Sequence, residues 1–240
     1  MQNNRIARVL QAMQAQGLTQ MIVSDTQSID YLTGVYVEPF ERLFALYLRA
    51  DGRHIFFLNK LFTVPETPIE KVWFTDTDDA VGMIASRVEA GAPLGIDKTW
   101  PARFLLPLME RLPGTPCRLA SDCVDGVRAC KDAAEQELMR ENSRINDEAM
   151  RRAAAYIREG MTEREVAEYL LAQYQALGCE GPSFPPIVSF GANAADPHHA
   201  PDDTCLQAGD CIVLDIGGKK DGYCSDMTRT YFCRSVSDKH

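Results

Sequence analysis

The sequence predicts an α/β N-terminal domain, in which helices pack on a mixed β-sheet, followed by an α+β region. Three observations lead to this prediction. Helical and strand-like hydrophobic patterns alternate through the first part of the chain, an Asp51-Gly52 turn joins two neighbouring strands there, and long capped helices follow in the second part. The hairpin makes the first sheet mixed rather than purely parallel. We place the domains at residues 1–125 and 126–240, with a junction over residues 125–131.

Short apolar runs between turn residues predict the strands of the first domain. They cover residues 20–24, 43–49, 54–59, 72–75, 94–97 and 117–120. Apolar residues at helical spacing predict its helices. These are a first helix with Ile6, Val9, Leu10 and Met13 on its buried face and Gly17 at its end, and two more over residues 80–88 and 102–111.

Two capping-box signatures predict the helices of the second region. Asp132 and Glu135 begin the first helix, and Thr162 and Glu165 begin the second. The expected buried faces contain Leu138, Ile145, Ala149, Ala153 and Tyr156 in the first helix, and Val166, Leu170 and Tyr174 in the second. Proline-rich loops and strands follow.

The composition disfavours several classes of protein. Hydrophobic residues make up 45% and charged residues 25%, as in an ordinary globular protein. The net charge of −9 argues against nucleic-acid or membrane partners. No apolar run approaches the roughly 18 residues of a membrane span, and the N-terminus lacks a secretory signal, so we expect a cytoplasmic protein. The eight cysteines form no CxxC pair, and we expect small buried hydrophobes rather than a zinc site or a disulfide framework.

A strand–turn–strand pattern near the end of the sequence contains two carboxylates, Asp215 and Asp226. If the turn is centred on Lys220-Asp221, the two aspartates face each other directly, with Cβ atoms roughly 5 Å apart. If it is centred on Asp221-Gly222, the pairing shifts by two residues. The aspartates then still share a face, because side chains alternate along a strand. Both registers remain open at this point.

Two like charges on one face repel each other, so the pair needs either a proton or a bound cation. Carboxylate oxygens suit divalent ions such as Mg, Mn, Co and Zn, and two such ions about 3.5–4 Å apart form a recurrent hydrolytic centre. The alternative is a pair of surface aspartates with Lys219, Lys220 and Arg229 as counter-ions. Spacing alone favours neither interpretation.

The hairpin and several other segments carry a family resemblance. The hairpin reads Val-Leu-Asp-Ile-Gly over residues 213–217 and Gly-Tyr-Cys-Ser-Asp-Met-Thr-Arg-Thr over residues 222–230. The other segments are residues 29–34, 124–131, 145–150 and 187–199. Together they resemble the proline-specific pita-bread metallopeptidases, the Xaa-Pro dipeptidases (prolidases) and Xaa-Pro aminopeptidases. The resemblance implies a creatinase/prolidase-like N-terminal domain, then the N-terminal portion of a pita-bread catalytic domain.

The resemblance also implies roles for individual residues. Asp215 would bind one divalent ion, and Asp226 would bridge two (Mn, Co or Zn). His198, rather than the adjacent His199, would contact the substrate or the tetrahedral intermediate. Two further residues, Thr228 and Arg229, would orient the carboxylates. Cys224, beside the site, is assigned no role.

The family's remaining metal ligands, one His and two Glu, lie on later strands that this sequence does not contain. His240 comes too early to be the missing His. We therefore expect either a fragment of a longer enzyme, which the abrupt end over residues 235–240 favours, or a natural truncation without peptidase activity. In both cases the 240 residues are expected to be inactive on their own. The implied substrates are proline-containing dipeptides or peptides, with substrate length left open.

Two other interpretations remain open. One is a non-catalytic pita-bread module that binds peptides or proteins, and the other is a creatinase-like C–N hydrolase that works without metal. The paired aspartates speak against both. The family also implies a homodimer in which the N-terminal domain of a neighbour helps to close the site. Tyr36 and Arg42 are weak candidates for such contacts and are more simply ordinary surface residues.

Overall fold

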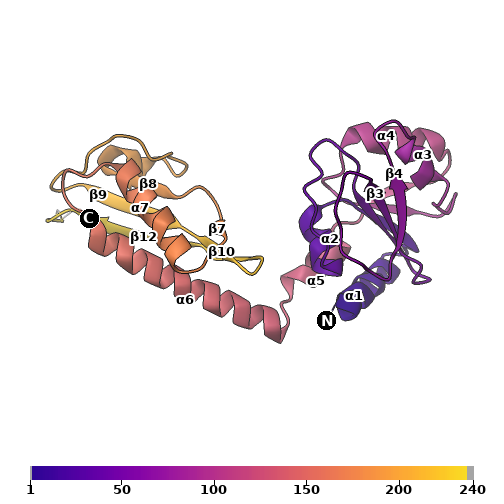
Figure 1. Ribbon diagram of the computed structural model, residues 1–240, viewed down its shortest axis with the longest axis horizontal. Coiled ribbons are helices and arrows are strands. Elements are labelled where there is room, and N and C mark those ends of the chain that lie inside the picture. Colours follow the sequence, from indigo (N-terminus) through magenta and orange to yellow (C-terminus); the bar gives the residue numbers. More distant parts are fainter. Residues whose placement is uncertain (1, 237–240) are drawn as a thin grey trace. The chain divides into compact units, whose positions relative to one another are not determined.

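Figure 1 shows the protein as a computed structural model that describes residues 2–236. The chain forms two compact units, Met1–Cys130 and Lys131–His240. The division falls after Cys130 because helix α5 (Asp122–Ala129) packs against the N-terminal helix α1 (Gln2–Ala15).

The first unit is built on a 6-stranded sheet with the order β4-β3-β2-β1-β5-β6. Its strands are β1 (Gln20–Val23), β2 (Ala45–Arg49), β3 (Ile55–Asn59), β4 (Glu70–Phe74), β5 (Leu94–Ile96) and β6 (Cys117–Leu119). Strand β2 runs antiparallel to β1 and β3, while the other neighbours are parallel. The predicted mixed sheet is confirmed, and Gly52 adopts a positive φ of 80° in the predicted turn.

Helices cover both faces of this sheet (Figure 1). One apolar core joins the sheet to α1, α2 (Thr26–Thr33) and α5, and the other joins it to α3 (Ala80–Ala85) and α4 (Ala102–Arg111). Neighbouring strand residues divide between the two cores: Met21 packs in the first and Ile22 in the second. This division follows from the alternation of side chains along a strand.

The structure differs from the prediction in three helices of the first unit. Helices α2 and α5 were not predicted, and α3 ends at Ala85 rather than at Val88. Val88 is nevertheless buried, as expected, with 8% of its surface exposed.

Two long helices begin the second unit, as predicted. Helix α6 (Ala133–Tyr156) starts at a complete capping box between Asp132 and Glu135, and α7 (Glu163–Ala176) starts at one between Thr162 and Glu165. In each box the side chains satisfy backbone N–H groups that have no partner within the helix.

Short strands complete the second unit in two 3-stranded sheets, β12-β9-β8 and β11-β10-β7. The elements are β7 (Gly181–Pro182), β8 (Ile187–Phe190), the 3-10 helix η1 (Gly191–Ala195), β9 (Cys211–Ile216), β10 (Gly218–Lys220), β11 (Tyr223–Cys224) and β12 (Met227–Phe232). Even-numbered residues of β9 pack with α6 and α7 in one apolar core. Odd-numbered residues therefore occupy the face that these helices do not cover.

A chain of buried hydrogen bonds joins this core to the end of β9. The Tyr174 hydroxyl donates to Asn146 Oδ1 at 2.5 Å, and Asn146 Nδ2 donates to the carbonyl of Ile216 at 3.1 Å. Burial raises the pKa of Tyr174, so the hydroxyl stays protonated as a donor.

We expect Tyr174→Phe to lower the free energy of unfolding by about 1–3 kcal/mol, because it leaves Asn146 Oδ1 buried without a donor. Urea denaturation measures the effect. Tyr169→Phe is the matched control. It keeps the stacking of Tyr169 on Tyr156, at 3.8 Å between ring centroids, and should change stability by less than about 0.5 kcal/mol. Equal losses in the two variants would contradict this account.

The cysteines are free thiols, and their burial varies. Cys123 and Cys233 are buried, as expected. Cys130, Cys205 and Cys224 are exposed, so for these three the expectation of buried hydrophobes is wrong. Within residues 2–236, none of the helices combines the length and apolar character needed to span a bilayer.

Candidate metal centre

Strands β9 and β12 form the predicted hairpin and fix the positions of the two aspartates. Asp215 pairs with Thr228, and Ile216 pairs with Met227. Across the same hairpin, Lys220 pairs with Tyr223. The turn is thus centred on residues 221–222.

The register in which the aspartates face each other directly is therefore wrong, and the alternative register is confirmed. The physical reason lies in the turn. Asp221 and Gly222 both adopt positive φ, at 52° and 76°. Positive φ at both central residues is the type I′ pattern that Asp-Gly favours, because its twist matches that of the strands.

Asp215 and Asp226 still share one face of the hairpin. Leu214 and Ile216 point into the core with α6 and α7, so Asp215 lies on the other face, where it is partly exposed. On the opposite strand Ser225 is buried and Asp226 is exposed. The aspartates are therefore diagonal neighbours on the face that the helices leave uncovered.

Gly217 lies between the two aspartates in the hairpin, where no other residue fits. A Cβ atom at this position would overlap the Ser225 carbonyl oxygen and Ser183 Oγ. Ser183 Oγ also donates to that carbonyl at 2.8 Å, while Ser225 Oγ accepts from Gly218 N at 3.0 Å. The glycine lets the strands approach closely next to Asp226.

Thr228 holds the Asp215 carboxylate, with its hydroxyl donating to Asp215 Oδ1 at 2.8 Å. Arg229 pairs with Leu214 in the register, and its guanidinium donates to the carbonyl of Thr228 at 2.8 Å. The orienting roles of Thr228 and Arg229 stay predictions. Lys219, one of the proposed counter-ions, instead lies 3.7 Å from Glu180.

The donor set at this face fits a divalent cation. In residues 2–236 no ion pair joins a lysine, arginine or histidine to Asp215 or Asp226. By contrast, the partly exposed Glu148 has two guanidinium partners, and Arg151 and Arg152 lower its pKa to about 2. Carboxylates that share a face without a cationic side chain suit a hard or borderline divalent ion.

The two adjacent histidines have different surroundings. The His198 side chain is exposed, and its backbone N–H donates to Asp196 Oδ1 at 2.9 Å. The His199 side chain is only 15% exposed and lies 2.6 Å from the carboxylate of Glu163. The predicted substrate contact of His198 remains a prediction.

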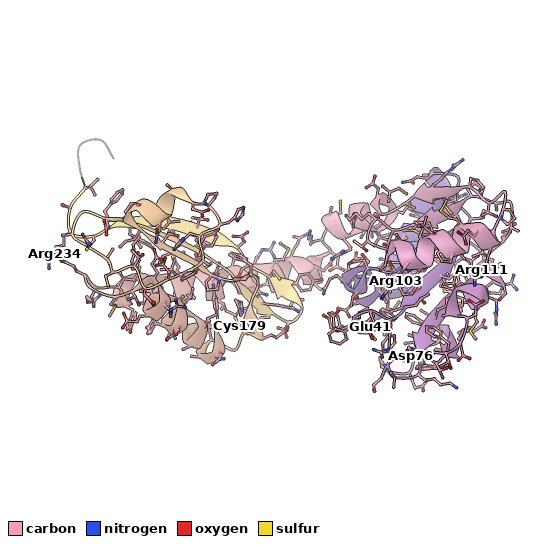
Figure 2. The ribbon with its side chains drawn as sticks, turned by 90° about the horizontal axis from the view of Figure 1, so that it is seen from above. Glu41, Asp76, Arg103, Arg111, Cys179 and Arg234 are labelled. Carbon is pink, nitrogen blue, oxygen red and sulfur yellow. The ribbon has the colours of Figure 1, made fainter. Side chains whose placement is uncertain are left out.

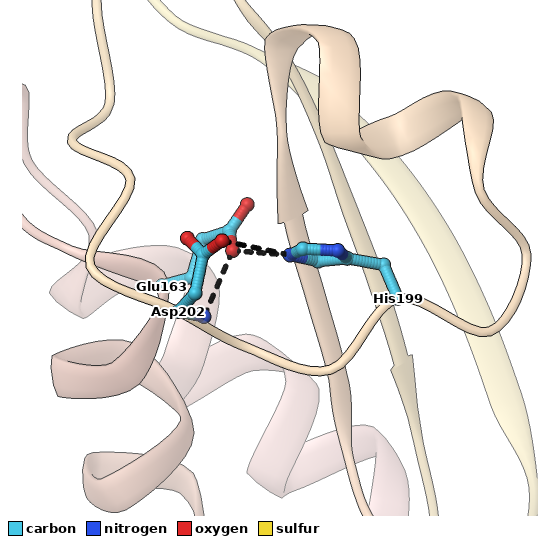
Figure 3. A group of neighbouring side chains, drawn as sticks. All are labelled: Glu163, His199 and Asp202. Atoms are coloured by element: carbon cyan, nitrogen blue, oxygen red, sulfur yellow. Dashed lines mark hydrogen bonds and ion pairs between the residues drawn. The ribbon is translucent and has the colours of Figure 1, made fainter.

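A second group of possible metal ligands consists of Glu163, His199 and Asp202, whose ligand atoms lie within 4.8 Å of one another (Figure 3). Sequence reasoning missed Glu163 and Asp202. Glu163 lies 36 residues before His199 in the sequence, and no sequence motif connects these two residues. Glu163 gives a weak signal as an acidic residue directly after the Thr162 cap.

The two residues considered for contacts with a neighbouring subunit lie in the first unit. Arg42 pairs with Asp76 at 3.0 Å and with Glu41 at 2.7 Å, and Figure 2 labels both acidic partners. Tyr36 is 50% exposed. Paired charges and a half-exposed ring are ordinary surface features, and a subunit contact stays a prediction.

Two family models match the chain. Residues 5–130 match the creatinase/prolidase N-terminal domain, and residues 137–240 match metallopeptidase family M24. The curated relatives include the probable dipeptidase PepE of Mycobacterium tuberculosis, 33% identical over 95% of this chain. The chain spans 62% of the length of that relative.

Solved structures agree with this assignment. Dipeptidase PepE from Mycobacterium ulcerans superposes with a TM-score of 0.90 and 32% identity, covering 99% of this chain and 66% of its own. Recombinant prolidase from Thermococcus sibiricus gives a TM-score of 0.89 and 27% identity, covering 100% of this chain and 67% of its own. The predicted creatinase/prolidase-like domain, followed by part of a pita-bread domain, is confirmed. The chain belongs to the family of proteins with a creatinase/prolidase N-terminal domain, and its second part matches metallopeptidase family M24.

Proposed function

We propose that this protein is a metal-dependent exopeptidase that hydrolyses Xaa-Pro bonds in dipeptides or at the N-termini of peptides. One observation carries the proposal: Asp215 and Asp226 share an uncovered sheet face without a cationic side chain, in a unit that matches family M24. Relatives named as a dipeptidase and a prolidase support the substrate class.

In this proposal Asp215 holds one ion and Asp226 bridges two, with Mn, Co or Zn as candidates. Bound divalent ions would supply an acidified water and polarise the scissile carbonyl. Thr228 keeps the Asp215 carboxylate oriented through its 2.8 Å hydrogen bond. His198, exposed on the loop before β9, donates a hydrogen bond to the substrate.

Two carboxylates cannot complete the coordination of two ions. We therefore propose that hydrolysis needs ligands and a general base beyond those on the 240-residue chain, which on its own is inactive. A homodimer is part of the same proposal. A non-catalytic module or a metal-free hydrolase would have no use for a repulsive carboxylate pair.

The test uses the protein encoded by the natural gene, beside the 240-residue chain. Each is stripped of metal with a chelator and reconstituted separately with Mn²⁺, Co²⁺ or Zn²⁺. Hydrolysis of Ala-Pro, Ala-Pro-Ala and Ala-Ala is then measured. We expect metal-dependent cleavage of at least one proline substrate by the gene-encoded protein, with Ala-Ala cleaved poorly. Activity without metal, or no preference for proline, would contradict the proposal.

A further inference from the structure

Glu163 is a fully buried carboxylate at the first position of helix α7, with 0% of its surface exposed. A buried charge is costly unless hydrogen-bond donors surround it. The α7 N-terminus favours a negative charge here, but the contacts of Glu163 extend well beyond its own helix.

Four N–H groups converge on this carboxylate. Oε1 accepts from the backbone of Phe190 at 2.7 Å and from Asn193 Nδ2 at 3.1 Å. Oε2 lies 2.6 Å from His199 Nε2 and accepts from the backbone of Asp202 at 3.1 Å (Figure 3). In the His199 tautomer that carries its proton on Nε2, the imidazole is the fourth donor to this carboxylate. Glu163 thus ties α7 to the end of β8, to η1 and to the following loop.

This arrangement is complete without a metal ion. Each oxygen of Glu163 already accepts two hydrogen bonds, which fills its acceptor sites. A cation would displace donors such as the buried N–H of Phe190 and leave them without a partner, which is unfavourable for a buried polar group. The nearby Asp202 also has its own donor, since the backbone N–H of Thr204 donates to Asp202 Oδ1 at 2.7 Å. Hydrogen bonds from Thr204 lower the pKa of Asp202.

The same contacts fix the backbone on both sides of His198. On one side, the His198 N–H donates to Asp196 Oδ1 at 2.9 Å. On the other side, the ring of His199 is held by Glu163. Glu163 also holds Phe190 in β8, the strand whose residue Ile187 pairs with Asp215. One buried carboxylate therefore links the loop of His198 to the strand beside the candidate metal centre.

We propose that Glu163 and His199 form a clamp that positions His198 for the reaction, with His199 a positioning residue rather than a metal ligand or a catalytic residue. The catalytic part of this inference rests on the proposed function. Misplacing a reacting group by about 1 Å can lower a rate about 100-fold. Loosening the clamp should therefore lower kcat while the metal centre stays intact.

The primary comparison is between His199→Leu and His199→Gln in the gene-encoded protein. Leucine removes the donor to Glu163, and glutamine replaces it with an amide N–H of similar reach. We expect kcat to fall about 10–100-fold in H199L and to stay within about threefold of wild type in H199Q, with metal content unchanged in both. Glu165→Ala is the structural control: it breaks the capping box of the same helix, away from Glu163, and should leave kcat unchanged.

A double-mutant cycle separates positioning from a general structural role. If His199 acts through His198, H199L should lower kcat less than about twofold in a His198→Gln background. A full additional loss in that background would overturn the clamp, and so would loss of bound metal in H199L alone.

Hydrogen exchange provides a readout that does not depend on activity. The Phe190 and Asp202 amides donate to Glu163, so exchange over residues 187–204 should be at least about tenfold faster in H199L and near wild type in H199Q. Unchanged exchange in H199L overturns the clamp even if the enzyme is active. Faster exchange in a protein that cleaves no Xaa-Pro substrate supports the clamp and refutes the proposed function instead.

Discussion

Asp226→Asn is expected to lower kcat/KM for an Xaa-Pro substrate by about 10³-fold or more. The substitution removes the charge that we propose to bridge two ions. Losing the several kcal/mol that such ions supply to a transition state, taken as about 4 kcal/mol, corresponds to about three orders of magnitude. Steady-state kinetics of the gene-encoded protein measures the loss, and elemental analysis of the same samples should show fewer ions per chain.

Asp221→Asn is the matched control for this experiment. It removes the same charge from the same hairpin, and asparagine tolerates the positive φ of 52° at this turn position. We expect wild-type kinetics and metal content. If D221N and D226N lose activity equally, the effect comes from the charge or fold of the hairpin and not from a metal ligand.

Gly217→Ala is expected to lower the free energy of unfolding by about 3 kcal/mol, near the upper end for overpacking a rigid site. The added Cβ would overlap the carbonyl oxygen of Ser225, which is backbone and cannot rotate away. The two strands of the hairpin must then move apart next to Asp226. We therefore expect the affinity for metal to fall together with the stability. Urea denaturation and metal titration measure the two effects.

Gly181→Ala is the matched control in the neighbouring sheet. Gly181 pairs with Lys219, and a Cβ at Gly181 would have no heavy atom within 4 Å. We expect a change of less than about 1 kcal/mol. A similar loss of stability in G181A and G217A would show that the close approach at Gly217 is not the cause.

Local signals in the sequence predicted most of the fold. Both capping boxes of the second unit are present, and the turn at Gly52 joins the antiparallel pair β2 and β3. Helix α2 was missed although it carries signals of its own: Asp25 accepts a hydrogen bond from Ser28 N as its N-cap, and Gly34 ends it in a left-handed conformation. Helix α5 was missed because Gly126 interrupts a short segment across the expected domain junction.

For the hairpin, the sequence predicted the shared face of the two aspartates but left the register of the strands open. Strand alternation alone placed Asp215 and Asp226 on one face in either register. The Asp221-Gly222 dipeptide, a strong type I′ signal, could have selected the observed register. The buried carboxylate of Glu163 could not be found in this way. Its donors come from residues 27 to 39 positions away, and only the folded chain brings them together.

We propose above all that Asp215 and Asp226 hold the metal of this protein. Anomalous diffraction from crystals of the gene-encoded protein grown with Mn²⁺ tests it most directly. We predict anomalous peaks roughly 2.0–2.3 Å from carboxylate oxygens of both aspartates, and none at Glu163, His199 and Asp202. Peaks at the second group, or none on the hairpin, would contradict the claim.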